Sequence, residues 1–335
     1  MSWKNLKLGK KMAVGFGLML IMITAVGSWA IFGISGIVGN ASEVIDGNKL
    51  RGEMVQREVD HLNWAGEVNK LLTDKNVTTL HVQTDPKQCA FGKWYYGEGR
   101  KAAEAMVPAI APLLAEIEEH HSRLHESAIH IGEKFHQADT SLPKFLAEKE
   151  VDHLIWVNQV LTYLAEKQNE LNVQTSHELC SLGKFLYGDA GRKVAATDPE
   201  LAHLMEAMKE PHMHLHQSAI KIKAAGQDFA AAEHIFETET VVALRKTQAA
   251  LNKMKDRASE MLLGMEAAQG IYAEVSAPAL GKVQEILGKI NKTVEANVMT
   301  DEQMLSAASK TRLGVIIMAL LALPVGIFTG VVISR

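Results

Sequence analysis

Two long uncharged runs lie near the two ends of the chain, and they constrain its fold more than any other feature. The first extends from Met12 to Ser42 and the second from Val315 to Ile333. Each is long enough to cross a bilayer core of about 30 Å as a helix, and a membrane helix tolerates Pro324 in the second run. A cleaved signal peptide is the alternative for the first run, but its apolar part is too long for one. We expect transmembrane helices over residues 12–37 and 313–334.

Basic residues before the first run set the expected orientation. Lys4, Lys7, Lys10 and Lys11 stand there without an acidic residue before position 12, and such flanks stay in the cytoplasm. Residues 1–11 then form a cytoplasmic segment, and a second crossing returns Arg335 to the same side. We expect a two-pass protein of the cytoplasmic membrane whose intervening region is periplasmic or extracellular.

The composition favours helices and excludes some functions. The 335 residues include 47% hydrophobic ones, 15 methionines and only eight prolines, which suits an all-α chain. A net charge of −4 argues against a nucleic-acid partner. The chain contains neither a glycine-rich phosphate loop nor a serine nucleophile elbow, so we expect no enzyme activity.

The region between the runs contains an internal repeat. Four short motifs recur at an offset of 91 or 92 positions: VDHLNW (59–64) and VDHLIW (151–156), LHVQT (80–84) and LNVQT (171–175), CAFGKW (89–94) and CSLGKF (180–185), LHESAI (124–129) and LHQSAI (215–220). Apolar residues three and four positions apart indicate helices. The sequence therefore predicts two tandem domains resembling four-helix bundles, at 55–135 and 147–226.

A long coiled-coil-like stretch follows the second repeat, over residues 230–312. Apolar residues repeat there at heptad spacing, and the pattern is interrupted at Gly270 and Pro278: Leu244, Thr247, Leu251, Met254, Ala258, Met261, Met265 and Ala268 come before these two residues, and Leu280, Val283, Leu287, Ile290 and Val294 follow them. Such a seam packs against another helix. The helix belongs either to a partner subunit, in which case the chain is a homodimer, or to the core of the same chain.

Histidine and cysteine recur at matched positions in the two repeats. Repeat one offers His61, Cys89, His121 and His125, and repeat two offers the matching set His153, Cys180, His212 and His216. The last two histidines of each set are four residues apart, so they share one face of a helix. Three imidazoles and one thiolate suit a tetrahedral Zn²⁺ ion, although copper also accepts these ligands. We predict two zinc ions, one per repeat.

The remaining histidines and the pairing of the cysteines leave some alternatives open. His81 and His214 have no histidine at the equivalent position of the other repeat, which favours surface or supporting roles. His120 has none either, but it adjoins His121 and could replace it as a ligand. A bond between Cys89 and Cys180 is disfavoured, because equivalent positions of two repeats should lie apart.

These motifs resemble the chemoreceptor zinc-binding domain, over about 55–135 and 147–226. His-Leu-x-Trp, Cys-x-[Phe/Leu]-Gly-Lys-[Trp/Phe] and His-x-x-x-His carry the resemblance. It implies a four-helix bundle that holds zinc through the eight residues named above. The opening Lys-Leu-Gly-Lys-Lys-Met before a membrane span is also similar to the start of methyl-accepting chemotaxis proteins. That family domain is commonly cytoplasmic, whereas the charge pattern here places both repeats outside.

The resemblance implies a membrane-anchored sensory module of the chemotaxis type that detects a metal or an oxidant. We expect either a further output domain beyond Arg335 or a cytoplasmic signalling partner. A membrane-anchored protein that binds or buffers metal without signalling is the alternative. The sequence leaves open whether zinc is a stimulus or a structural element.

Overall fold

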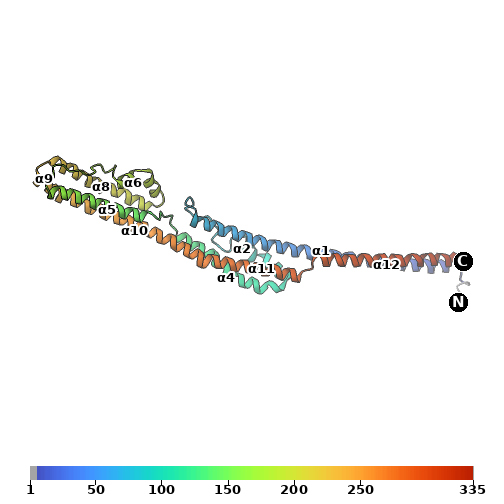
Figure 1. The fold of residues 1–335 in the computed structure, drawn as a ribbon. Coiled ribbons are helices and arrows are strands. Elements are labelled where there is room, and N and C mark those ends of the chain that lie inside the picture. The colour runs from blue at the N-terminus through green and yellow to red at the C-terminus, as the bar shows by residue number, and fades with distance from the viewer. Residues whose placement is uncertain (1–5, 335) are drawn as a thin grey trace. The chain divides into compact units, whose positions relative to one another are not determined.

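A computed structural model describes residues 6–334, and these residues form helices without any strand (Figure 1). The predicted all-α class is confirmed. Both apolar runs lie in long helices, one at each end of the described chain, and each is apolar and long enough to cross a membrane. Lys4 and Arg335, which enter the expected orientation, lie outside the described residues.

The helices follow one another along the chain with short connections. In chain order they are α1 (Leu8–Thr73), α2 (Ala90–Tyr95), α3 (Glu98–Met106), η2 (Pro108–Ile110), α4 (Ala111–Lys134), α5 (Leu142–Ala165), α6 (Ser181–Tyr187), α7 (Asp189–Ala195), α8 (Pro199–Ala225), α9 (Phe229–Ile235), η3 (Phe236–Thr240), α10 (Val241–Ile271), η4 (Tyr272–Ser276), α11 (Ala277–Asn297) and α12 (Asp301–Ser334). Repeat one thus uses α1 to α4, and repeat two uses α5 to α8. In each repeat the two middle α-helices are short, and the Leu-His-x-Ser-Ala-Ile motif lies in the last one.

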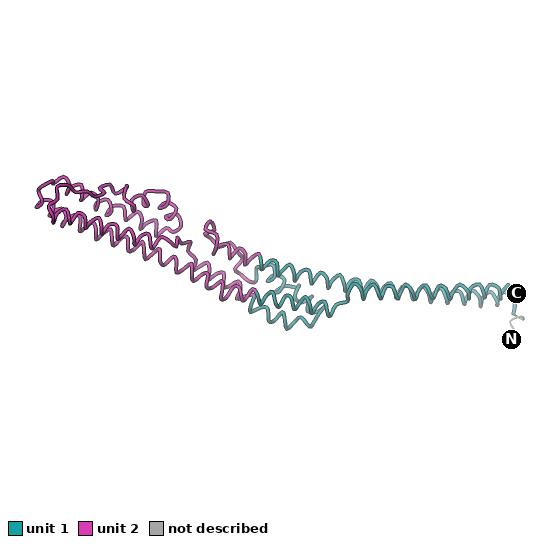
Figure 2. The backbone as a smooth tube through the Cα atoms, viewed as in Figure 1, with its two compact units in different colours: residues 1–62, 87–120, 281–335 teal, residues 63–86, 121–280 magenta. Residues whose placement is uncertain are grey.

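The chain divides into two compact units, coloured teal and magenta in Figure 2. Unit 1 comprises Met1–Leu62, Lys87–His120 and Gly281–Arg335. Unit 2 comprises Asn63–Pro86 and His121–Leu280.

In unit 1, α1 and α12 lie side by side and run antiparallel (Figure 1). Gly15 faces Ile333 and Gly33 faces Thr311, so closely that a Cβ on either glycine would overlap the opposite side chain. Large apolar side chains point outward along both helices, including Phe32 at 78% exposure. The sequence did not predict that the first apolar run and the helix of His61 form one uninterrupted helix of 66 residues.

The core of unit 1 lies where α1, α2, α4 and α11 meet. Met54, Phe91, Ile117 and Leu287 are buried together there. The predicted seam residues of α11, from Val283 to Val294, therefore contact other helices of the same chain.

In unit 2, α10 packs on α5 and α8. Leu251, Met254 and Met261 of α10 are at most 2% exposed, and they share one core with residues of α5, α6 and α8. The heptad seam is therefore internal to the chain, and the alternative that this seam forms a dimer interface is wrong. Its partner helices come from the second repeat, which heptad spacing alone does not reveal.

The interruption of the heptad pattern at Gly270 and Pro278 coincides with a change of helix type between these two residues. Five residues with π-helical hydrogen bonding, η4, join α10 to α11, so the helix continues through this region. Pro278 is the second residue of α11, a position at the start of an α-helix where proline is tolerated. A second π-helical turn, η3, joins α9 to α10.

Candidate metal centres

Three helical segments of repeat two bring together four side chains that could hold a metal ion. His153 comes from α5, Cys180 precedes α6, and α8 provides His212 and His216. One ligand atom of each residue lies within 4.8 Å of those of the other three. The Nε2 atom of His212 lies 3.1 Å from Nε2 of His153 and 3.2 Å from Sγ of Cys180. Side chains that are far apart in sequence therefore converge on one point.

Backbone carbonyls fix the tautomers of two of these histidines. Nδ1 of His153 donates to the Lys149 carbonyl at 2.6 Å, and Nδ1 of His216 donates to the Gln174 carbonyl at 2.8 Å. A carbonyl only accepts, so Nδ1 carries the proton in each ring and Nε2 keeps its lone pair. Nε2 of His216 is buried and has no hydrogen-bond partner. A buried nitrogen lone pair normally has a partner, and a metal ion would provide one here.

The cysteine of each set is the N-cap of a short helix. Sγ of Cys180 accepts a hydrogen bond from the Gly183 amide at 3.2 Å, and Sγ of Cys89 accepts one from the Gly92 amide at 3.1 Å. A backbone amide aimed at sulfur favours the thiolate that a metal requires. Gly183 packs against the His177 carbonyl, where a Cβ would overlap that oxygen. The glycine thus allows the turn that presents Cys180.

Burial controls the charge of the group in repeat two. Desolvation lowers the pKa of His212 to about 2 and that of His216 to about 4, and it also lowers the pKa of His153. These imidazoles are neutral at pH 7 and can act as ligands. Burial raises the pKa of the Cys180 thiol, against the opposing effect of the backbone amides. Metal binding must therefore displace the thiol proton.

A tryptophan and a histidine share one backbone acceptor in each repeat. The indole Nε1 of Trp156 donates to the Gln174 carbonyl at 2.8 Å, which also accepts from His216. Trp64 donates to the Gln83 carbonyl at 2.7 Å, and this oxygen lies 2.8 Å from Nδ1 of His125. The sequence did not identify the tryptophans as donors to these carbonyls. The Val-Gln-Thr motif recurs at this place in both repeats, but it does not indicate which backbone carbonyl is the acceptor.

Repeat one contains an equivalent group. It consists of His61, Cys89, His121 and His125, whose ligand atoms also lie within 4.8 Å of one another. Nδ1 of His61 lies 2.6 Å from the Arg57 carbonyl, as Nδ1 of His153 lies beside that of Lys149. All three histidines of this group are at most 3% exposed.

The donor set and its dimensions fit zinc. Tetrahedral Zn²⁺ with N and S ligands places its donor atoms about 3.3–3.6 Å apart. The separations of 3.1 and 3.2 Å around His212 are close to these values. Three neutral imidazoles and one thiolate would give each zinc site a net charge of about +1.

Several other histidines lie outside both groups. His120 is half-buried on α4, and neither His81 nor His214 joins a group. His177 was not singled out from the sequence, yet its ring lies 6.3 Å from that of His212 and 5.8 Å from that of Tyr187. Repeat one has Pro86 at the equivalent position, so this contact distinguishes the second group.

The two segments that carry these groups match a known family of domains. The model of the chemoreceptor zinc-binding domain matches residues 61–131 and again residues 153–223. Comparison with curated proteins and with solved structures gives no significant match. Domains of this kind occur in chemoreceptors and bind zinc, and each matched segment here contains one group of three histidines and one cysteine.

Proposed function

We propose that this chain is the membrane-anchored sensory module of a chemoreceptor of the methyl-accepting type, and that it binds one zinc ion in each repeat. The ligands are His61, Cys89, His121 and His125 in repeat one, and His153, Cys180, His212 and His216 in repeat two. The observation that carries this proposal is the recurrence of one buried N₃S group, with the same supporting hydrogen bonds, in both repeats.

The apolar helices support anchoring in the membrane. Side chains such as Phe32 and Phe328, at 78% and 70% exposure, would lie in lipid rather than in water. Lys7, Lys10 and Lys11 precede this region, and they favour a cytoplasmic N-terminus and a periplasmic position for both repeats. Known domains of this family are usually cytoplasmic, so the sidedness requires its own test.

Sidedness is tested by labelling single cysteines in intact cells. Ser2→Cys and Ser141→Cys are each introduced into a chain with Cys89→Ser and Cys180→Ser. A membrane-impermeant maleimide should label position 141 and not position 2. Labelling of position 2 alone would reverse the topology and place the repeats in the cytoplasm.

An exposed apolar face of α5 supports a homodimer. Val151, Leu154, Ile155 and Leu161 are 44–54% exposed and recur at helical spacing. Val59 and Leu62, the equivalents of Val151 and Leu154, are also exposed in repeat one. This face, rather than the buried seam of α10, is the surface we propose for contact with a second copy.

Signalling is tested by joining residues 1–335 to the cytoplasmic part of a methyl-accepting chemotaxis protein. Addition of zinc, a zinc chelator or hypochlorous acid should change the activity of the associated kinase. The same fusion with Cys89→Ser and Cys180→Ser should not respond. A metal-buffering protein would leave the kinase unchanged in both forms, and that result would exclude the sensory role.

A further inference from the structure

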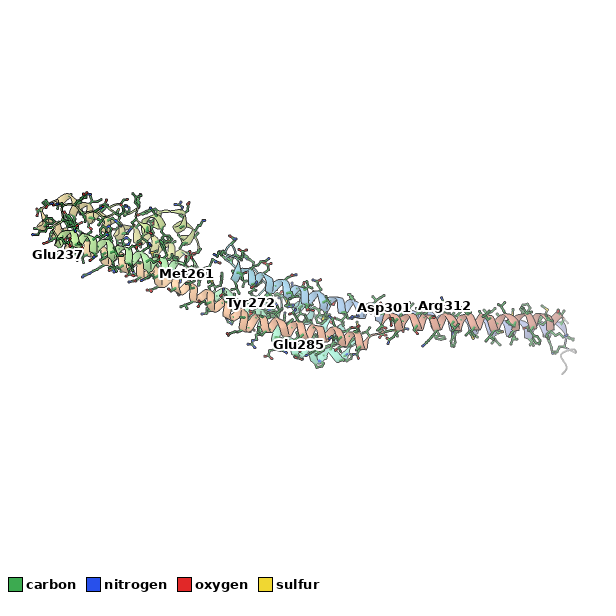
Figure 3. The ribbon with its side chains drawn as sticks, in the orientation of Figure 1. Glu237, Met261, Tyr272, Glu285, Asp301 and Arg312 are labelled. Atoms are coloured by element: carbon green, nitrogen blue, oxygen red, sulfur yellow. The ribbon has the colours of Figure 1, made fainter. Side chains whose placement is uncertain are left out.

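Two π-helical turns interrupt the helical run that follows the second repeat. They are η3, which contains Glu237, and η4, which begins at Tyr272 (Figure 3). No other π-helical turn occurs in residues 6–334. Turns of this kind are rare and occur often at functional sites. Both lie within unit 2.

Each π-helical turn ends in a buried hydroxyl that contacts a histidine-bearing helix. Thr240, the last residue of η3, donates to Oγ of Ser218 at 2.8 Å. Ser276, the last residue of η4, lies 2.7 Å from Oγ of Ser127. All four residues are at most 1% exposed. Two contacts of the same chemistry thus join different parts of the long helix to α4 and α8.

The two serines occupy the same position relative to the proposed metal ligands. Ser127 follows His125 by two residues, and Ser218 follows His216 by two. Their hydroxyls donate to the carbonyls of Leu124 and Leu215, the residues just before those histidines. Each serine is therefore an acceptor for the hydroxyl of the π-helical turn. The Leu-His-x-Ser-Ala-Ile motif carries this serine in both repeats, a feature that zinc binding alone does not explain.

Buried hydroxyls that lose their partner are costly, so each pair opposes any relative shift of its two helices. A π-helical turn contains about one residue more than an α-helical turn. If the turn becomes α-helical, that residue moves into the next turn of the helix. That change would displace the following residues by about 1.5 Å and rotate them by roughly 100°. The hydroxyl pair therefore favours the π-helical form of each turn over a straightened one.

We propose that the pairs Ser127–Ser276 and Ser218–Thr240 couple zinc occupancy to the π-helical turns. Zinc holds α4 or α8 in the position that maintains the pair. Loss of zinc frees that helix, breaks the pair and lets the turn change its hydrogen bonding. The helix that leads to α12 would then change its register. This inference rests on the proposed zinc binding. It adds the contacts through which a change in zinc occupancy is transmitted from each site to the long helix.

Hydrogen exchange on the full chain in detergent tests this coupling. Amides in peptides that cover 234–244 and 270–280 are compared with zinc bound and after chelation. Zinc should slow exchange in both π-helical turns by about tenfold, the effect of one buried hydrogen bond on local opening. Elemental analysis of the same samples reports the number of zinc ions.

Variants of the hydroxyl residue in each π-helical turn test the two contacts separately. Thr240→Val should abolish the effect of zinc on η3 and leave the effect on η4, and Ser276→Ala should do the reverse. Both should keep two zinc ions. Ser218→Ala removes the η3 contact from the other side and should reproduce Thr240→Val, which guards against a folding defect of one variant.

The outcomes distinguish this inference from the proposed function. Equal zinc dependence in parent and variants would overturn the coupling, as would a parent that holds two zinc ions but shows no protection at η3 and η4. A parent without bound zinc would overturn the zinc sites themselves and the coupling with them.

Discussion

The Nε2 atoms of His153 and His212 lie 3.1 Å apart in the interior of unit 2, although 59 positions separate the residues. The proton of His153 is on Nδ1, because that atom donates to the Lys149 carbonyl. The lone pair of His153 therefore faces the ring of His212. Nε2 of His212 can donate a proton to that lone pair. A zinc ion between the two rings would instead accept the Nε2 lone pairs of both.

The two sites should bind zinc independently, because each repeat carries its own ligands. His153→Ala should reduce the zinc content from two ions per chain to one, and His61→Ala should do the same through the other site. The double variant should hold none. Elemental analysis of purified protein checks this, and a loss of both ions in either single variant would show that the sites are coupled.

The tryptophan donors should tune zinc affinity. Trp156→Phe keeps most of the ring but loses the hydrogen bond to the Gln174 carbonyl, which also positions His216. Loss of such a supporting contact reduces metal affinity by roughly 10- to 100-fold. Competition with a chromogenic chelator should show one weakened site in Trp156→Phe and one in Trp64→Phe. Unchanged affinity in both would assign the tryptophans a packing role only.

Zinc binding should release about one proton per site at neutral pH. Burial holds the pKa of the Cys180 thiol above its ordinary value, and the pKa values of His212 and His216 stay near 2 and 4. Only the thiol must therefore lose a proton. The logarithm of the affinity should rise with pH with a slope of about one per site. A slope near two would mean that an imidazole is protonated before binding.

Oxidants should release the zinc. Peroxide or hypochlorous acid converts a thiolate to sulfenic acid, which removes the one negatively charged ligand of each site. A chromogenic zinc-release assay should show loss of both ions from the parent. Cys89→Ser with Cys180→Ser should bind metal at least about tenfold more weakly than the parent. If oxidant leaves the metal in place, the sites are structural elements or direct metal sensors.

A buried ion pair should make repeat two sensitive to acid. Asp198 caps α8 through the Leu201 amide and pairs with Arg257, whose guanidinium holds the pKa of Asp198 below its ordinary value of 3.8. Because the pKa is lower in the folded state, the ionised carboxylate stabilises the fold at pH values above 3.8. This stabilisation is lost as the pH falls through the pKa of the folded state. Asp198→Asn keeps the cap, so it isolates the charge.

Thermal or denaturant unfolding measures the contribution of this pair. Asp198→Asn should reduce the free energy of unfolding by about 2 kcal/mol at pH 7. Arg257 loses its buried partner and keeps only the more exposed Glu200 and Glu260. The difference between parent and variant should shrink as the pH falls below 4. Asp198→Ala should cost about 1 kcal/mol more, because the cap is lost as well. A difference that does not depend on pH would contradict the assignment to charge.

The proposed dimer surface is tested by changing exposed residues of α5. Ile155→Asp with Leu161→Asp should convert the dimer to a monomer without loss of helix, since both side chains are about half-exposed. Mass in solution is read by light scattering. Leu251→Ala, in the buried seam, should instead lower stability by about 2–5 kcal/mol and leave the mass unchanged. A parent protein that is monomeric in solution would contradict the proposed homodimer.

The helical class and the convergence of the histidines and cysteines could be predicted, because periodicity and the repeat fix which residues share a helix face. His121 and His125 are four apart on α4, and their rings lie 4.7 Å apart as that spacing requires. The group that contains Cys89 includes His121 and not His120. Which of these two adjacent residues faces the cysteine depends on the rotation of α4 about its axis, which the spacing of the histidines alone does not determine.

Other features depend on contacts that leave no distinct sequence pattern. The carbonyls of Gln83 and Gln174 orient histidines and tryptophans, and a backbone carbonyl carries no residue identity. The seam of α10 was visible, but its partner helices were not, since heptad spacing does not say which chain supplies them. Gly270 and Pro278 indicated an interruption of the heptad pattern, but not that the π-helical turn η4 lies between them.

The zinc content of the full chain tests the central claim most directly. The protein is purified without chelator and analysed for metals, with the variant carrying Cys89→Ser, His125→Ala, Cys180→Ser and His216→Ala as the matched control. The account predicts about two zinc ions per parent chain and none in the control. Bound metal that is absent from the parent, or equal in parent and control, would contradict it.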